Sequence, residues 1–298
     1  MSYIRVRGVE HYYEWIRTPA AASENKPVMV FLHGWGGSAR YWESTANALS
    51  DTFDCLLYDM RGFGRSISRA SESTSPLLQE PPVTAAELTY ELEEYAEDLA
   101  GLLDALQLSR VYINAHSTGA SVATFFLNLY PERVERAILT CSGIFEYDEK
   151  SFTAFHKFGG YVVKFRPPWL AKIPLMDKMF MKRFLHRPLP GAVSLAFLED
   201  FLVADYAAAL GTMLDAVSKK AAEVMPLEFA KVKVPTLLVA GERDIIIPAA
   251  MGRQAAALND NVEYCEIPDT AHFPMLEDSV TYLGRVREFL GVSCPAPA

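Results

Sequence analysis

The sequence has few cysteines, no run of basic residues and no long apolar stretch, and each absence narrows what the protein can be. Its four cysteines are scattered among 298 residues, without the Cys-x-x-Cys spacing of a metal or redox site. We expect free thiols, three of them in apolar strand-like runs. Half of the residues are apolar, so the chain can bury a large core without cross-links.

Charge and hydropathy exclude further classes. The chain has 28 lysines and arginines against 37 acidic residues, a formal charge of −9, which argues against nucleic acid and anionic membranes as partners. No apolar stretch reaches the roughly 18 residues of a membrane span. The first residues alternate like a strand and lack the apolar core of a signal peptide. We therefore expect a cytoplasmic protein without a membrane span.

Cofactor signatures are missing too. The stretch Gly62-Phe-Gly64-Arg-Ser-Ile67 lacks the third glycine of a dinucleotide fingerprint. The sequence has no Gly-Lys-Ser/Thr phosphate loop and no His/Cys/Asp group with metal-ligand spacing. We expect neither a cofactor nor a metal.

Strand-like and helical patterns alternate along most of the chain. Residues 3–7 and 11–17 predict an antiparallel pair around Gly8. Later strands are predicted at 27–33, 53–58, 111–113, 137–140, 235–241 and 262–267, and helices at 41–49, 85–106, 119–129, 249–258 and 276–290. Because the later strands are apolar on both faces, the pattern predicts an α/β fold with a mostly parallel sheet covered on both sides.

Residues 145–230 break this rhythm. They are rich in phenylalanine, methionine and proline and show helical spacing but no strand. We expect a mainly helical lid above the carboxyl edge of the sheet, where open α/β sheets bind ligands. Packing within the lid explains any one aromatic residue, but together they indicate an apolar substrate cavity. The predicted division is a core in two parts (1–144 and 231–290), the lid (145–230) and a frayed tail (291–298).

One turn offers a reactive side chain. In Ala115-His-Ser117-Thr-Gly119, small residues join a strand to a helix and place a serine at the junction. Serine needs an adjacent base that is itself oriented by an acid. Asp244 directly follows the strand ending near 240, and His272 follows the strand ending at 267. The order Ser, Asp, His is that of the α/β-hydrolase nucleophile elbow.

Four motifs resemble the α/β-hydrolase superfamily, of the capped esterase- and lipase-like kind. They are His33-Gly34-Trp35-Gly36-Gly37 for the oxyanion loop, Asp59-Met-Arg-Gly-Phe-Gly-Arg-Ser66 for the next strand's turn, Gly241-Glu-Arg-Asp244-Ile-Ile-Ile-Pro248 for the acid and Ala271-His272-Phe-Pro for the base. The resemblance implies an eight-stranded, mostly parallel sheet flanked by helices, with the lid inserted after the sixth strand. Ala115 replaces the first glycine of the family's Gly-x-Ser-x-Gly, and we expect a working elbow with tighter packing.

The resemblance also implies roles. Ser117 attacks an acyl carbonyl, His272 transfers the proton and Asp244 orients the imidazole. The backbone N–H groups of Trp35 and Thr118 hold the oxyanion. Substrate contacts are expected from Trp35, Phe145 and Phe273.

Alternatives remain for several of these residues. Glu242 lies close enough in sequence to Asp244 to serve as the acid instead. His33 and His116 are expected to bond loop backbone rather than act on substrate. Asp59 and Arg61 are expected to form a structural ion pair or a cap.

The favoured function is hydrolysis of a carboxylic ester of an apolar small molecule by a monomer or homodimer. The same triad serves carbon–carbon bond hydrolysis of a vinylogous diketone, or opening of a lactone or thioester. A ligand receptor that keeps the hydrolase fold is an alternative from another class. The dehalogenase and epoxide-hydrolase branches are disfavoured because they place an aspartate where this chain has Ser117.

Overall fold

A computed structural model describes residues 2–18, 26–67 and 88–293 of the chain. The serine- and proline-rich residues 67–83 are expected to form a long polar connection, and all of them but residue 67 lie outside the described residues. The start of the predicted helix at 85–87, Cys294 and most of the predicted tail lie outside them as well. None of the helices in the described part is long and apolar enough to cross a bilayer.

Eight strands form one sheet in the order β1-β2-β4-β3-β5-β6-β7-β8. The strands are β1 (Ser2–Val6), β2 (Val9–Ile16), β3 (Val28–Leu32), β4 (Asp54–Tyr58), β5 (Val111–His116), β6 (Val134–Thr140), β7 (Thr236–Gly241) and β8 (Val262–Ile267). β2 pairs antiparallel with β1 and β4, and every later pair is parallel. The mostly parallel, eight-stranded sheet is confirmed.

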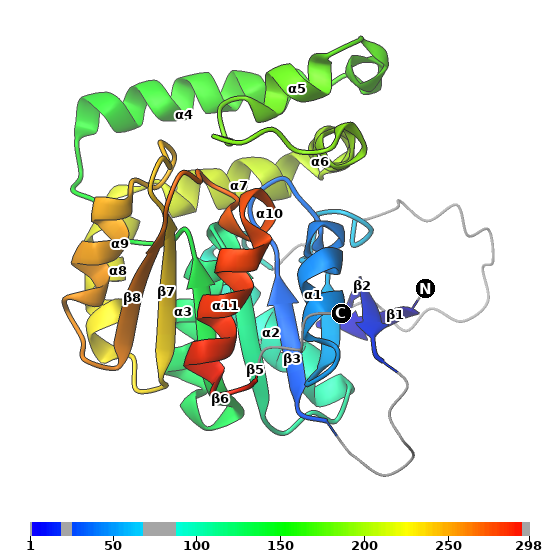
Figure 1. The fold of residues 1–298 in the computed structure, drawn as a ribbon. Helices are drawn as coiled ribbons and strands as arrows, with labels where there is room; N and C mark the ends of the chain where they lie inside the picture. Colours follow the sequence, from blue (N-terminus) through cyan, green and yellow to red (C-terminus); the bar gives the residue numbers. More distant parts are fainter. Residues whose placement is uncertain (1, 19–25, 68–87, 294–298) are drawn as a thin grey trace.

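Helices cover both faces of the sheet (Figure 1). One layer holds α2 (Leu92–Ala105), α3 (Thr118–Leu129) and α8 (Lys219–Lys231), and the other holds α1 (Glu43–Leu49) and α11 (Ser279–Leu290). Side chains alternate between two cores: Leu139 in β6 packs with Leu99 and Phe126, while its neighbour Ile138 packs with Leu49 and Val286. Burial on both faces explains why the central strands β3 and β7 are continuously apolar, whereas the edge strand β8 carries two glutamates.

The helices between β6 and β7 stand above the carboxyl edge of the sheet (Figure 1). They are α4 (Glu149–Lys164), α5 (Met176–Met181), α6 (Gly191–Val203) and α7 (Tyr206–Ala216). The next helix, α8, packs instead beside α3 and beside α9 (Ala249–Ala256) in the layer that flanks the sheet. We call residues 145–216 the helical segment; its role as a lid and the predicted domain boundaries stay predictions.

One helix begins later than the sequence suggests. The predicted start near residue 85 is wrong for residues 88–91, which are not helical, because α2 begins at Leu92. The Leu92 N–H donates to the Asp215 carboxylate on α7, 2.9 Å away. This cap comes from a residue 123 positions later, so local sequence could not place it.

Candidate active site

Ser117 occupies a strained turn between β5 and α3. Its backbone angles are φ 53° and ψ −122°, outside the regions that residues other than glycine usually adopt. The Ser117 N–H donates to the Thr140 carbonyl on β6, and the Ser117 carbonyl accepts from the N–H groups of Ala120 and Ser121. These bonds hold a conformation that costs about 1–3 kcal/mol, and they leave the serine side chain half-exposed.

The two small residues of this turn have different roles. A Cβ atom on Gly119 would lie 2.4 Å from the His33 carbonyl oxygen, so α3 can approach β3 only with glycine at that position. Ala115, which replaces the other glycine of the family pattern, is fully buried in the core. The methyl group is therefore accommodated where the sequence departs from the pattern.

His272 and Asp244 reach Ser117 from the ends of neighbouring strands. His272 Nε2 lies 3.0 Å from Ser117 Oγ, and His272 Nδ1 lies 2.7 Å from Asp244 Oδ2. The other Asp244 oxygen accepts the N–H groups of Ile246 and Ile247, which fixes the carboxylate in its turn. The His272 and Asp244 side chains are almost fully buried. The structure thus joins residues that are 155 and 28 positions apart in sequence.

Glu242, the alternative acid, lies elsewhere. Its carboxylate accepts the Asp269 N–H at 2.9 Å and lies 3.4 Å from the Arg243 guanidinium. The structure places Asp244, not Glu242, against the His272 imidazole.

The predicted oxyanion loop lies directly against the turn. A Cβ atom on Gly34 would lie 3.1 Å from Ser117 Cβ, so this glycine permits the close approach. Trp35 follows Gly34, and Thr118 is the first residue of α3, where helix geometry leaves the N–H without an intrahelical partner. The Trp35 indole N–H donates to the Ala209 carbonyl on α7 at 2.8 Å, which ties the loop to the helical segment.

Comparison with known proteins agrees with this geometry. The alpha/beta hydrolase fold family model matches residues 27–279. The chain belongs to this family. Mouse epoxide hydrolase 3 is 27% identical over 241 residues, covering 76% of this chain and 59% of that protein.

Two solved structures show the same fold. The enol-lactonase from Burkholderia xenovorans has a TM-score of 0.73 at 21% identity, with 97% of this chain and all of that chain covered. The bromoperoxidase from Bacillus anthracis has a TM-score of 0.77 at 19% identity, with the same coverage. At such identity the likeness shows the α/β-hydrolase fold alone.

A second hydrogen-bond chain runs behind the reactive atoms of this hydrolase fold. The Gly34 N–H donates to Tyr41 Oη, which lies 2.9 Å from His116 Nδ1; His116 Nε2 lies 2.7 Å from the His272 carbonyl oxygen. Burial, with a smaller contribution from His272, lowers the pKa of His116 well below its usual value. A neutral His116 whose Nδ1 accepts from the Tyr41 hydroxyl and whose Nε2–H donates to the His272 carbonyl gives both ring nitrogens a hydrogen-bond partner. The predicted bond from His116 to loop backbone is confirmed.

Sequence reasoning missed Tyr41 and also Glu277. One Glu277 oxygen accepts the N–H groups of Ala271 and Phe273, on either side of His272. The other accepts the N–H groups of His186 and Arg187, from the helical segment. One buried carboxylate therefore shapes the loop of His272 and ties it to the helices above. The only sequence signal is a glutamate five residues after the histidine.

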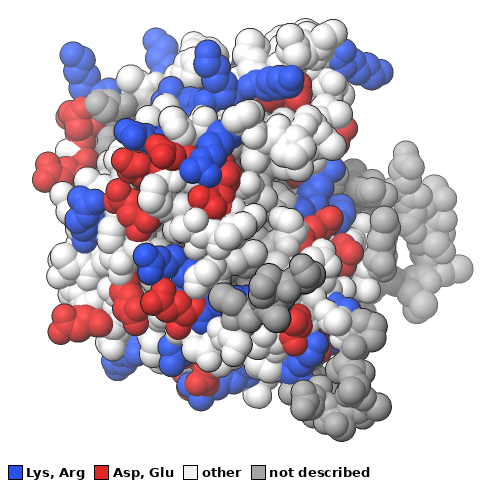
Figure 2. Space-filling model, in the orientation of Figure 1, with Lys and Arg blue, Asp and Glu red and all other residues white. Residues whose placement is uncertain are grey.

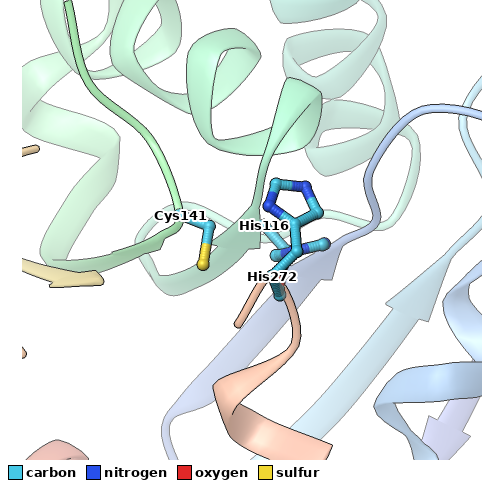
Figure 3. A group of neighbouring side chains, drawn as sticks. All are labelled: His116, Cys141 and His272. Carbon is cyan, nitrogen blue, oxygen red and sulfur yellow. Dashed lines mark hydrogen bonds between the residues drawn. The ribbon is translucent and has the colours of Figure 1, made fainter. Parts of the chain in front are cut away.

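Cys141 joins His116 and His272 in a compact group (Figure 3). Their ligand atoms lie within 4.8 Å of one another, which sequence spacing did not reveal. Both histidines already use both ring nitrogens in hydrogen bonds, so a metal ion would have to displace those bonds. Burial and the neighbouring Asp244 carboxylate raise the pKa of the Cys141 thiol well above its usual value, which keeps it protonated and unreactive.

The remaining polar residues near the loop are structural. His33 Nε2 accepts the Met60 N–H at 2.9 Å, which confirms the predicted bond to loop backbone. Asp59 and Arg61 both form structural ion pairs, but with other partners than each other: Asp59 pairs with Arg65, and Arg61 pairs with Asp98, each at 2.7 Å.

The residues expected to contact substrate are dispersed. The Phe273 ring is buried, 5.5 Å from the His272 ring and 4.6 Å from the Phe197 ring. Trp35 is half-buried and its ring lies 5.5 Å from that of Phe201. Phe145 packs on Phe152 within the helical segment. Trp35 and Phe273 thus adjoin the site, whereas the ring contact of Phe145 is with the segment itself.

Proposed function

We propose that this protein is a serine hydrolase that cleaves a carboxylic ester of an apolar small molecule through an acyl-enzyme on Ser117. The observation that carries the proposal is the continuous path from Ser117 Oγ through the His272 imidazole to the Asp244 carboxylate, with steps of 3.0 and 2.7 Å. This is the arrangement that general-base activation of a serine requires.

The chemistry follows from this path. Ser117 Oγ bonds to the acyl carbon as its proton passes to His272 Nε2, and Asp244 stabilises the imidazolium. The N–H groups of Trp35 and Thr118 hold the oxyanion. Collapse of the intermediate breaks the bond to the alcohol, which leaves with the proton from His272. Water then attacks the acyl-enzyme by the same route and releases the acid.

The surroundings favour an apolar substrate under a lid. The Phe184 ring, from the helical segment, lies 6.1 Å from the His272 ring, and Phe273 lies on another side of it. The backbone N–H of His272 donates to the Phe184 backbone carbonyl at 2.9 Å. In this proposal the helical segment covers the reacting atoms and supplies apolar contacts to the substrate.

Turnover of p-nitrophenyl esters with short and medium acyl chains tests the proposal. Ser117→Ala is expected to lower kcat by about 10⁶-fold, because no other group forms the acyl-enzyme. Ser121→Ala, one turn further along α3, is the matched control and should keep its activity. Undiminished ester turnover by Ser117→Ala would contradict the proposal.

A lactone is the second candidate substrate, because the enol-lactonase shares the fold over 97% of this chain. A lactone is an internal ester, so the same residues would open it. Comparing kcat/KM for matched open-chain esters and lactones decides between the two.

A further inference from the structure

The helix α4 has two apolar faces, and only one of them is needed for folding. Val163 is buried, and a Cβ atom on Gly159 would lie 2.4 Å from the Met213 sulfur on α7, so this face packs inward. On the opposite face, Phe158 is 70% exposed and Phe165 is 67% exposed. Tyr161 between them is exposed as well. Exposed aromatic side chains at this spacing gain nothing from the fold.

The aromatic stripe continues beyond the helix. The Phe165 ring lies 6.5 Å from the ring of Trp169, which is 52% exposed in the short helix η4 (Pro168–Lys172). Exposed lysines accompany the stripe at seven-residue intervals, at 150, 157 and 164. We call Phe158, Tyr161, Phe165 and Trp169 together with these three lysines the basic aromatic face.

Charge is strongly segregated in the molecule. Between Glu149 and Arg187 there are nine lysines and arginines but two acidic residues, a formal charge of +7 in a chain whose total is −9. Figure 2 shows the cationic side chains along the upper edge, where Figure 1 places α4 and α5 farthest from the sheet. The whole-chain charge that argued against an anionic membrane hides this segregation.

We propose that the basic aromatic face docks on an anionic lipid surface. Amphipathic helices that lie in a membrane interface combine phenylalanine and tryptophan with lysine in this way. Aromatic rings insert at the level of the headgroups, while lysine side chains extend to the lipid phosphates. The acidic remainder of the protein is repelled, so the basic aromatic face turns toward the lipid. The docking is independent of the proposed ester hydrolysis.

A second copy of the chain fits this face less well. A two-fold dimer places the same surface against itself, which would bring the three lysines of one copy against those of the other. Lipid phosphates instead supply the opposite charge.

Co-sedimentation of the full chain with vesicles tests the proposal. The protein is expected to sediment with vesicles of phosphatidylcholine and phosphatidylglycerol, to remain in solution with phosphatidylcholine alone, and to be released by salt. Lys157→Gln with Lys164→Gln should weaken binding about 30-fold, since each lysine near an anionic surface contributes about 1 kcal/mol. Phe158→Ser with Phe165→Ser should weaken it at least about tenfold.

The matched control removes one exposed apolar side chain and changes the total charge by the same amount as the lysine variants, but elsewhere on the molecule. Val280→Ser with Lys233→Glu alters an 82% exposed apolar side chain and an exposed lysine outside the helical segment, and should leave binding unchanged. Thermal unfolding checks that all variants are folded. The proposal is wrong if the wild-type protein sediments with neither kind of vesicle, or if the variants of the basic aromatic face bind like wild type. It is also wrong if the wild-type protein forms oligomers and the variants of this face are monomers.

Discussion

The carboxyl edge of the sheet and the helical segment above it differ in how firmly their side chains are held. At the edge, Ser117, His272 and Asp244 are fixed by short hydrogen bonds to one another and to backbone. On the outer side of the segment, Phe158 and Phe165 are left exposed. Folding therefore determines where these three side chains lie, whereas the exposed side of the outer helices is available to a partner.

Among substitutions that keep Ser117, the largest effect should come from a single atom at the carboxyl edge. Asp244→Asn keeps the shape but favours the wrong imidazole tautomer, so kcat should fall about 10⁴-fold. Glu242→Gln, its near neighbour in sequence, should change kcat less than about twofold because its carboxylate bonds only outside the triad. Ester kinetics with both variants checks this, and equal losses would remove the distinction between the two carboxylates.

Acid should lower the free energy of unfolding through a buried histidine in the sheet. His11 on β2 is buried, with Nδ1 2.9 Å from Tyr58 Oη, and burial lowers its pKa to about 4. The unfolded chain therefore binds a proton at His11 at a higher pH than the folded protein does. Neutral His11 favours the folded state fully above pH about 6.5, and this contribution to the free energy of unfolding is lost as the pH falls towards 4. The loss amounts to about 3 kcal/mol.

Urea unfolding at several pH values measures this loss. His11→Gln keeps a partner for Tyr58 but cannot take up the proton, so its stability should depend less on pH. Burial lowers the pKa of His33 and His116 in the same direction, so part of the acid effect will remain. A pH dependence identical to that of wild type would rule out His11 as a source.

The smallest predicted effect concerns the supporting hydrogen-bond chain. Tyr41→Phe leaves the buried Gly34 N–H without an acceptor and removes a hydrogen-bond partner of His116. We expect kcat to fall about tenfold and the free energy of unfolding to fall by about 1–3 kcal/mol. Tyr282→Phe is the control: its hydroxyl bonds Asn114 and Thr140, and it should lose stability without losing kcat. If both variants keep full kcat, Tyr41 does not position the site.

The sequence was informative wherever a residue's role depends on its place along a strand. Ser117, Asp244 and His272 lie within five residues of the ends of β5, β7 and β8, and parallel strands bring such positions to one edge. The glycine-rich loop after β3 was recognisable for the same reason.

Roles that depend on distant partners could not be predicted. Tyr41 and Glu277 carry no motif, and each acts by bonding backbone that the fold brings near. The later start of α2 depends on Asp215, far along the chain. The total charge of −9 likewise concealed the positive stretch from Glu149 to Arg187, because a total does not show how charges are distributed along the chain.

Mass spectrometry after reaction with a fluorophosphonate shows whether Ser117 is the nucleophile. We expect one adduct per chain, on the peptide that contains Ser117. Ser117→Ala should show no adduct, and His272→Ala should react far more slowly. An adduct on Cys141 or on another serine, or no adduct on the wild-type protein, would contradict the account.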